Sequence, residues 1–548
     1  MTLFDDHLLS PVGIMYSLGI LFASVILYAI STIVYNLLFH PLRHIPGPWL
    51  AGSTPIPYGL QMRSGKIVTW IQQLHAQYGD VVRVTPTEVS FISGETAWPE
   101  IYGFRTGEYK DTGAYLKDNA WFPKPINGVW SIINSNEADH ARLRRNLSHA
   151  FSDKALRSQE SLITSYVDLL IHKLSEHAEN CAPVDIMRWY NYTTFDIIAD
   201  LSFGEPLYCL RDSEYHMWVN MVFSSLKGIP TIAIRNKYLV FRWLDKLRGL
   251  FTDTQVAVRA RKQFFDMASA RVSTRLEKET SRPDFFTFIL QNQSHANRAL
   301  SRGEMDTNAV VFLVAGSETT ATTLSGTTYL LLKNRTAYNR LTTELRTAFP
   351  TASSITLDAV NTLPYLLAVL QEGLRYYPPV PTGFPRTVPG AGQVISGHFI
   401  PGGTSVYVSQ HAANHSARNF ADADAFVPER WLAGERGDKY EEDRREVVQP
   451  FSLGPRNCLG KKYVVFFFAF AFAFAFAFAF AFAFVFVFAF ASFSSPLAYA
   501  EMRLILAKLL YTFDLELVQP EREWMEEQRV FALWEKPPLA VRLTAVRR

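Results

Sequence analysis

The stretch Phe451-Ser-Leu-Gly-Pro-Arg-Asn-Cys-Leu-Gly460 decides the fold of this chain of 548 residues. It holds Cys458 in a turn bounded by Gly454 and Gly460, and glycine allows backbone conformations that are closed to other residues. Backbone N–H groups in such a turn can point at the sulfur, and hydrogen bonds of this kind tune a metal bound there. The pattern therefore predicts a thiolate ligand to haem iron. The alternative interpretation is a buried structural cysteine.

Two further residues of this stretch suit a haem site. Arg456 can reach a haem carboxylate, and Phe451 can shield the sulfur from water. The stretch resembles the haem-binding loop of the cytochrome P-450 monooxygenases, Phe-x-x-Gly-x-Arg-x-Cys-x-Gly, at every defined position. The run from Phe384 to Gly460 is similar to the fungal secondary-metabolism members in particular.

This resemblance implies a mainly α fold, a helical haem domain with small β-sheets, and haem b held by Cys458 and Gly454 of the loop. It implies a monooxygenase that inserts one atom of O2 into a small apolar molecule, plausibly a secondary-metabolite intermediate. Electrons would come from NADPH through a separate NADPH-cytochrome reductase. With a net charge of +3 the chain is nearly balanced, so no nucleic-acid partner is expected.

Residues 1–40 are predicted to form a membrane anchor. The run Val12–Phe39 is strongly apolar and longer than the roughly 20 residues that a helix needs to span a bilayer. Positive charge follows this run, which favours a single-pass anchor with residues 41–548 in the cytosol. The proline-rich segment His44–Trp49 reads as a stiff hinge, and it resembles the hinge of microsomal members. We therefore expect this segment to remain as an uncleaved anchor in the endoplasmic reticulum membrane. The alternative is that it is a cleaved signal peptide.

A second motif, Val314-Ala-Gly-Ser-Glu-Thr-Thr320, lies within a long apolar helix expected over Thr307–Lys333. The small pair Ala315-Gly316 leaves space against a flat cofactor, and a threonine hydroxyl can bond back to the preceding turn. The alternative is a buried Ser/Thr-rich helix with one solvated acid. Beside the cysteine loop, the motif resembles the oxygen-activation stretch Ala-Gly-x-(Asp/Glu)-Thr. This resemblance gives Glu318 and Thr319 the catalytic role of guiding protons to the oxygen being activated.

A third set of residues suggests a structural network. Glu372 and Arg375 are three apart on a predicted helix and can pair on one face. Alone this pair is a weak signal, but Arg430, in Phe426-Val-Pro-Glu-Arg-Trp431, could close a Glu–Arg–Arg network. The arrangement is similar to the family's Glu-x-x-Arg helix and Pro-Glu-Arg-Phe element, with tryptophan in place of phenylalanine. Arg386 occupies a position where family members often hold a haem propionate.

His140 and Arg144 lie four residues apart on a predicted helix that ends near Phe151. Haem propionates are anionic, and these two side chains share one helix face. The stretch resembles the family's Trp-x-x-x-Arg helix, with histidine in place of tryptophan. The neighbouring Arg142 and Arg145 are expected to be solvated, or to form a basic face toward a reductase.

The tract Tyr463–Pro496 interrupts the expected domain. It is almost entirely alternating Phe and Ala, a low-complexity pattern with no counterpart in the family. The helix that follows the cysteine loop in the family begins here at Leu497, and removing the tract restores the family's spacing. A retained intron fits, because Lys-Tyr-Val can be encoded with the fungal splice-donor sequence GTATGT. A second membrane span and an aggregating strand are the other interpretations, and a protein that binds haem but is inactive is the alternative function.

Overall fold

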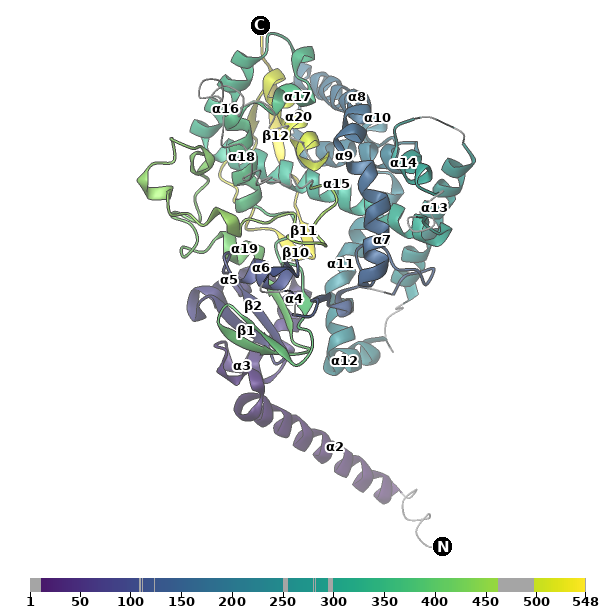
Figure 1. The fold of residues 1–548 in the computed structure, drawn as a ribbon, viewed down its shortest axis with the longest axis vertical. Coiled ribbons are helices and arrows are strands. Elements are labelled where there is room, and N and C mark those ends of the chain that lie inside the picture. The colour runs from purple at the N-terminus through teal and green to yellow at the C-terminus, as the bar shows by residue number, and fades with distance from the viewer. Residues whose placement is uncertain are drawn as a thin grey trace, which may run out of the picture.

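The computed structural model describes residues 11–107, 110, 112–122, 124–249, 255–278, 280, 282–293, 299–461 and 497–547. This part of the chain is mainly helical, with small sheets placed among the helices and one long helix projecting from the base (Figure 1). The expected fold class, a mainly α chain with small β-sheets, is confirmed. The Phe-Ala tract lies outside the described residues.

The helices have the following bounds: α2 Pro11–Val34, α3 Trp49–Ser53, α4 Ile56–Ser64, α5 Ile67–Tyr78, α6 Ala97–Tyr102, α7 Glu137–Leu147, α8 Asp153–Glu179, α9 Ile186–Phe203, α10 Cys209–Asp212, α11 Met217–Lys237, α12 Leu239–Gly249, α13 Gln255–Glu277, α14 Phe285–Gln291, α15 Arg302–Lys333, α16 Arg335–Ala348, α17 Leu357–Val360, α18 Pro364–Tyr376, α19 Gln410–Asn414 and α20 Leu497–Thr512. The strands are β1 Val81–Thr85, β2 Glu88–Phe91, β3 Leu116–Lys117, β4 Val184–Asp185, β5 Arg386–Thr387, β6 Gly392–Ile395, β7 His398–Pro401, β8 Ser405–Val408, β9 Phe513–Leu517, β10 Arg529–Phe531, β11 Leu533–Glu535 and β12 Ala540–Ala545.

The largest sheet has the strand order β1-β2-β8-β5-β3 and is antiparallel except where β2 pairs with β8. It joins residues more than 300 positions apart, because Glu88 lies opposite Ser405 in this parallel pair. At the far edge of the sheet β3 pairs with β5, so that Lys117 lies opposite Arg386. This register brings two of the basic side chains discussed below to the same place.

Helix α15 is the central element of the helical part and packs against α9 (Figure 1). Its start is fixed by a capping box: the Ser301 hydroxyl accepts from the Glu304 amide at 3.3 Å, and the Glu304 carboxylate accepts from the Ser301 amide at 2.8 Å. The two helices approach closely because residue 316 is glycine. A Cβ there would lie 2.6 Å from Cδ1 of Ile198 on α9. Gly316 therefore serves helix packing, and the expectation that it leaves space for a cofactor is wrong.

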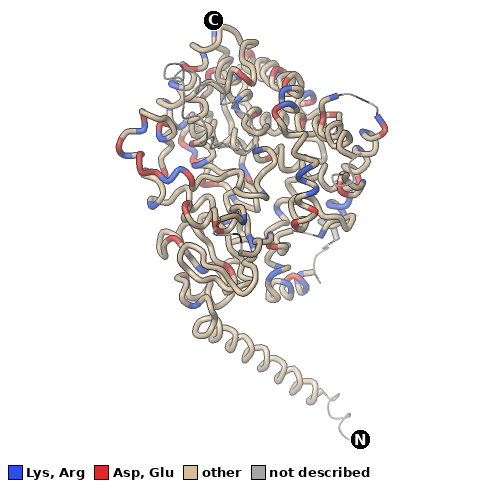
Figure 2. The backbone as a smooth tube through the Cα atoms, in the orientation of Figure 1, with Lys and Arg blue, Asp and Glu red and all other residues tan. Residues whose placement is uncertain are grey.

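Helix α2 carries no charged residue and projects away from the rest of the chain (Figure 2). Together with the turn that follows, it forms an apolar helical stretch of 29 residues, Pro11–Phe39, with none of its most apolar window buried. Its end is fastened to the domain by Arg83 on β1, whose guanidinium donates to the Asn36 carbonyl at 3.0 Å. The Asn36 side chain in turn donates to the Ser53 carbonyl at 2.9 Å. These bonds make the predicted hinge a fixed junction.

Candidate functional site

The cysteine loop is closed by hydrogen bonds within it. The Cys458 amide donates to the Phe451 carbonyl at 2.9 Å, and the Asn457 amide donates to the Gly454 carbonyl at 3.2 Å. Gly454 has a φ of 76°, and a Cβ there would lie 1.8 Å from the Tyr102 carbonyl oxygen. Glycine is thus required at this position by backbone conformation and by the close approach of α6.

The sulfur of Cys458 lies in a polarised environment. Burial raises the pKa of the Cys458 thiol, while hydrogen bonds from the Gly460 and Lys461 amides and the charge of Arg144 act in the opposite direction. The Cys458 side chain nevertheless retains accessible surface. The Phe451 ring packs against Tyr499 of α20, with ring centroids 5.3 Å apart. A reachable thiol with two amides and a cation directed at it is suited to act as a thiolate ligand.

Several basic side chains lie near this thiol, among them Lys117 and Arg144. Lys117 and Arg386 are direct cross-strand neighbours, an arrangement that is unfavourable for like charges. Burial, and then the charges of Arg386 and Arg456, lower the pKa of Lys117 well below its usual value. Burial also lowers the pKa of Arg386 to about 10. One acidic residue, Glu137, opposes the charges of Arg386 and Arg456.

Several nitrogens of this cluster have no hydrogen-bond partner among the described residues: Nε and Nη1 of Arg386 and Nη1 of Arg456. Buried guanidinium donors are costly to leave unpaired, so the cluster is built for an anion. A thiol at one side and unpaired guanidinium donors at the other fit a haem, whose iron takes a thiolate and whose propionates take cations.

His140 and Arg144, the two α7 residues expected near the haem propionates, differ in charge and in hydrogen bonding. Burial, and then the charges of Arg456 and Arg144, lower the pKa of His140 to about 3, so its imidazole is neutral. Arg144 donates to the Asn457 carbonyl at 2.7 Å and also bonds the Asn457 side chain, which ties α7 to the cysteine loop. Arg142, expected to be solvated or to belong to a basic face toward a reductase, is partly exposed and forms an ion pair with Glu304 at the start of α15.

The α15 motif presents its residues to different neighbours. Ala315 is exposed and Thr319, one turn later on the same face, donates its hydroxyl to the Ala315 carbonyl at 2.8 Å. Thr320 is buried and forms a hydrogen bond with Glu501 of α20. Burial raises the pKa of Glu501 to about 8, and the bond from Thr320 acts in the opposite direction. Glu318 is also buried and is paired with Lys536. Of the two threonines, Thr319 is therefore the one beside the open face of Ala315.

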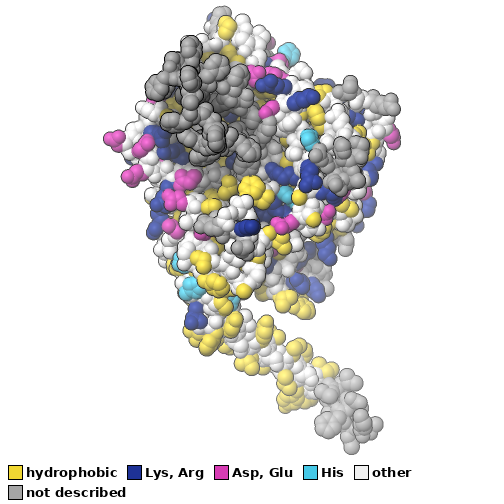
Figure 3. Space-filling model, in the orientation of Figure 1, with side chains coloured by type: hydrophobic (Ala, Val, Ile, Leu, Met, Phe, Trp, Pro, Cys, Tyr) yellow, Lys and Arg dark blue, Asp and Glu magenta, His cyan; other side chains and the backbone are white. Residues whose placement is uncertain are grey.

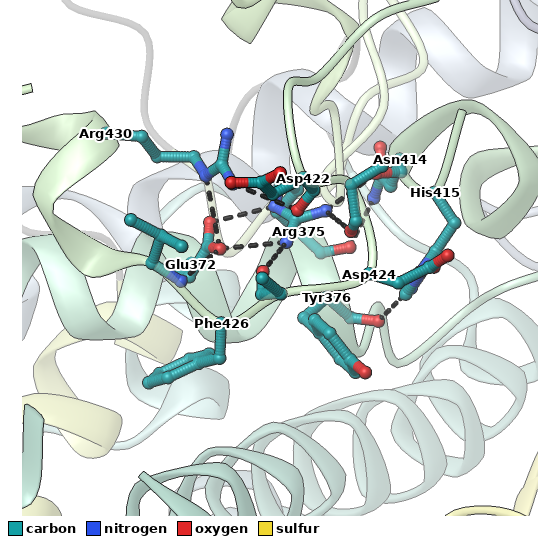
Figure 4. A network of polar contacts seen from close by, with 12 residues as sticks. Glu372, Arg375, Tyr376, Asn414, His415, Asp422, Asp424, Phe426 and Arg430 are labelled. Atoms are coloured by element: carbon teal, nitrogen blue, oxygen red, sulfur yellow. Dashed lines mark hydrogen bonds and ion pairs between the residues drawn. The ribbon is translucent and has the colours of Figure 1, made fainter. Parts of the chain in front are cut away.

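The expected Glu–Arg–Arg network is confirmed (Figure 4). The Glu372 carboxylate accepts two bonds from Arg375, each of 2.8 Å, and a third of 3.2 Å from Arg430. Trp431 adds an indole N–H bond of 2.9 Å to Glu372, which a phenylalanine could not make. Glu372 and both arginines have fully buried side chains. The Arg375 guanidinium also donates hydrogen bonds to the backbone carbonyls of residues 414, 423 and 425. The network braces the segment that leads to the cysteine loop.

Sequence patterns did not predict that Lys117, Glu501 or Lys536 belongs to the site. Lys117 becomes part of the basic cluster through strand pairing with Arg386, 269 positions later in the chain (386 − 117). Glu501 and Lys536 reach α15 from the C-terminal part of the chain. No local spacing marks such pairs. The only available signal was the presence of ionisable residues within apolar surroundings.

Comparisons with known proteins agree with this geometry. The family model described as Cytochrome P450 matches residues 51–463 of the chain. The chain is 45% identical to the cytochrome P450 monooxygenase traB of Penicillium crustosum, over 99% of both chains. It is 44% identical to the cytochrome P450 monooxygenase lcsI of Purpureocillium lilacinum, over 97% of this chain and 94% of that protein. The family match ends at the first residue of the Phe-Ala tract.

Proposed function

Because this chain belongs to the cytochrome P450 family and is a cytochrome P450 monooxygenase, we propose that Cys458 is the thiolate ligand of its haem b. One observation carries the proposal: a reachable thiol faces a basic cluster in which buried guanidinium nitrogens have no partner among the described residues. Arg386, Arg456, His140 and Arg144 line the propionate side. Lys117 joins them there.

The cysteine loop and α15 border the haem in this proposal. Gly454 shapes the loop, Phe451 covers its sulfur, and Ala315 gives the haem room on the opposite face. The haem, once bound, supplies the activation of O2, with electrons from NADPH through a separate NADPH-cytochrome reductase. The substrate is a small apolar molecule, an intermediate of secondary metabolism.

The protein's own part in the reaction is proton handling on α15. Thr319 has a hydroxyl at the open face, and Glu318 has a carboxylate adjacent in sequence. The Thr319 hydroxyl donates to the Ala315 carbonyl, so its oxygen is oriented to accept a hydrogen bond from water. Glu318 and Thr319 together form the proton path in this proposal.

Replacing Thr319 by valine is expected to lower product formed per NADPH oxidised by at least about 10-fold, since general acid–base groups commonly contribute 10²–10⁴-fold. NADPH oxidation itself continues. The measurement is product and hydrogen peroxide per NADPH, with any compound that shifts the haem spin state on binding. Thr320→Val is the matched control, because Thr320 faces Glu501 instead. Equal losses in both variants would contradict the assignment.

For localisation we infer a single-pass anchor in the endoplasmic reticulum membrane with the haem domain in the cytosol. Exposed apolar side chains support a membrane location: they run along α2 and continue at the base of the domain (Figure 3). On α12, Trp243 and Leu247 are 62% and 57% exposed, and Trp49 on α3 is 70% exposed. Such a surface is unfavourable in water and suits the interface of the membrane that holds α2.

A further inference from the structure

Glu318 is held by a residue from the far end of the chain. The Lys536 ammonium, directly after β11, bonds Glu318 Oε1 and also donates to the Thr322 hydroxyl at 2.7 Å. Both charged side chains are almost fully buried, with 3% of Lys536 and 2% of Glu318 exposed. A buried carboxylate is costly without a counter-ion, and Lys536 supplies that counter-ion to Glu318.

The pairing is asymmetric. Glu318 Oε1 accepts from Lys536 and, at 3.3 Å, from the Thr322 hydroxyl. Glu318 Oε2 is buried and has no hydrogen-bond partner among the described residues. One oxygen is thus anchored by two donors, and the other accepts no hydrogen bond from the described residues.

Lys536 is itself positioned by the β10–β11 hairpin. Trp534 on β11 stacks on Tyr377 with ring centroids 4.7 Å apart, and its indole N–H donates to the Pro378 carbonyl at 2.8 Å. The Lys536 ammonium also approaches the Trp534 carbonyl at 3.5 Å. The other titratable groups that interact with Glu318 are the Tyr215 and Tyr377 phenols. Burial raises the pKa of both, so they remain neutral at physiological pH.

We propose that Lys536 is a positioning residue for proton delivery, which keeps Glu318 ionised and leaves Oε2 as its proton-exchanging oxygen. This inference rests on the proposed role of Glu318 for its function, but the ion pair can be tested without turnover. It extends the site to the C-terminal hairpin, because a displacement of β11 would move the cation away from α15.

The test is infrared spectroscopy of the full-length protein at pH 7, with Lys536→Met compared with wild type. The variant is expected to gain a carboxylic-acid C=O band equal to one group per protein, and to lose it as the pH is raised. The band must be absent from the double variant Glu318→Gln/Lys536→Met. Absence of the band in Lys536→Met, in a protein that retains the wild-type fold by circular dichroism, would overturn the proposal.

Two further variants distinguish the loss of the Lys536 charge from a general disturbance of the fold. Lys536→Arg is expected to show no acid band, because it restores the cation. An acid band of equal size in this variant would also overturn the proposal. Lys227→Met is the matched control, since Lys227 of α11 pairs with Glu535 of the same hairpin at an exposed position. It should leave the spectrum unchanged. If the chain were no monooxygenase, these bands would still appear, so the two proposals fail separately.

Discussion

Replacing Glu372 by alanine is expected to destabilise the protein by about 3–5 kcal/mol, the usual cost of breaking a buried ion pair by removing one partner. Arg375 and Arg430 would keep their charges in a fully buried place, and among the described residues Arg430 would retain Asp443 alone as an acidic partner. The measurement is the urea midpoint of the full chain in detergent, followed by circular dichroism.

The matched control is Glu441→Ala. Glu441 also pairs with an arginine, Arg436, at 3.3 Å, but it is 64% exposed. Its loss should cost less than about 1 kcal/mol, as is typical for exposed ion pairs. Trp431→Phe removes one bond to Glu372 and leaves the two arginines paired, so it should fall between these variants. A Glu372→Ala midpoint equal to that of the control would show that the network does not brace the fold.

Deleting Tyr463–Pro496 is expected to leave the fold intact and to increase the yield of haem-loaded protein several-fold. The tract joins two elements that are already adjacent: a Cβ on Gly460 would lie 4.0 Å from Cβ of Ala498. After the deletion these residues are four apart in sequence, a spacing that suits neighbours on a helix. No flanking element needs to move. We therefore propose that the tract is foreign to the domain and derives from a retained intron.

The comparison uses the full chain and the deleted chain, expressed side by side, with haem content per protein as the readout. A control deletion that removes α13 should abolish haem loading, because α13 packs against α15. Lower haem content in the tract deletion than in the full chain would contradict the proposal. Sequencing of the spliced message tests the intron origin separately.

Amphipathic elements could be predicted from the sequence alone. Apolar residues at helical spacing predict a helix over Ile67–Tyr78, and α5 has those bounds with one face buried. Alternation over Val81–Ile92 predicts a hairpin, which corresponds to β1 and β2. Helix α9 was not predicted, because residues 189–203 are buried on every side and show no polar face. Helix α15 begins five residues before the expected start, at the Ser301 capping box.

The site was predictable where a motif is compact and not where it is assembled by the fold. The cysteine loop and the Glu372 network could be found because short spacings specify them. Lys117 and Lys536 could not, because strand pairing and a C-terminal hairpin bring them to their partners. Gly316 was misassigned for the opposite reason: a small residue in a motif is equally consistent with space for a ligand and with close helix packing.

The most direct test of the central claim, that Cys458 holds haem iron, is a reduced carbon-monoxide difference spectrum of the full chain and of Cys458→Ser. The account predicts a thiolate-type Soret band in the unmodified chain and complete loss of that band in the variant. The tract-deleted chain serves as a second background if the full chain loads little haem. A thiolate-type band that persists in Cys458→Ser, or its absence from both haem-loaded parent chains, would contradict the account.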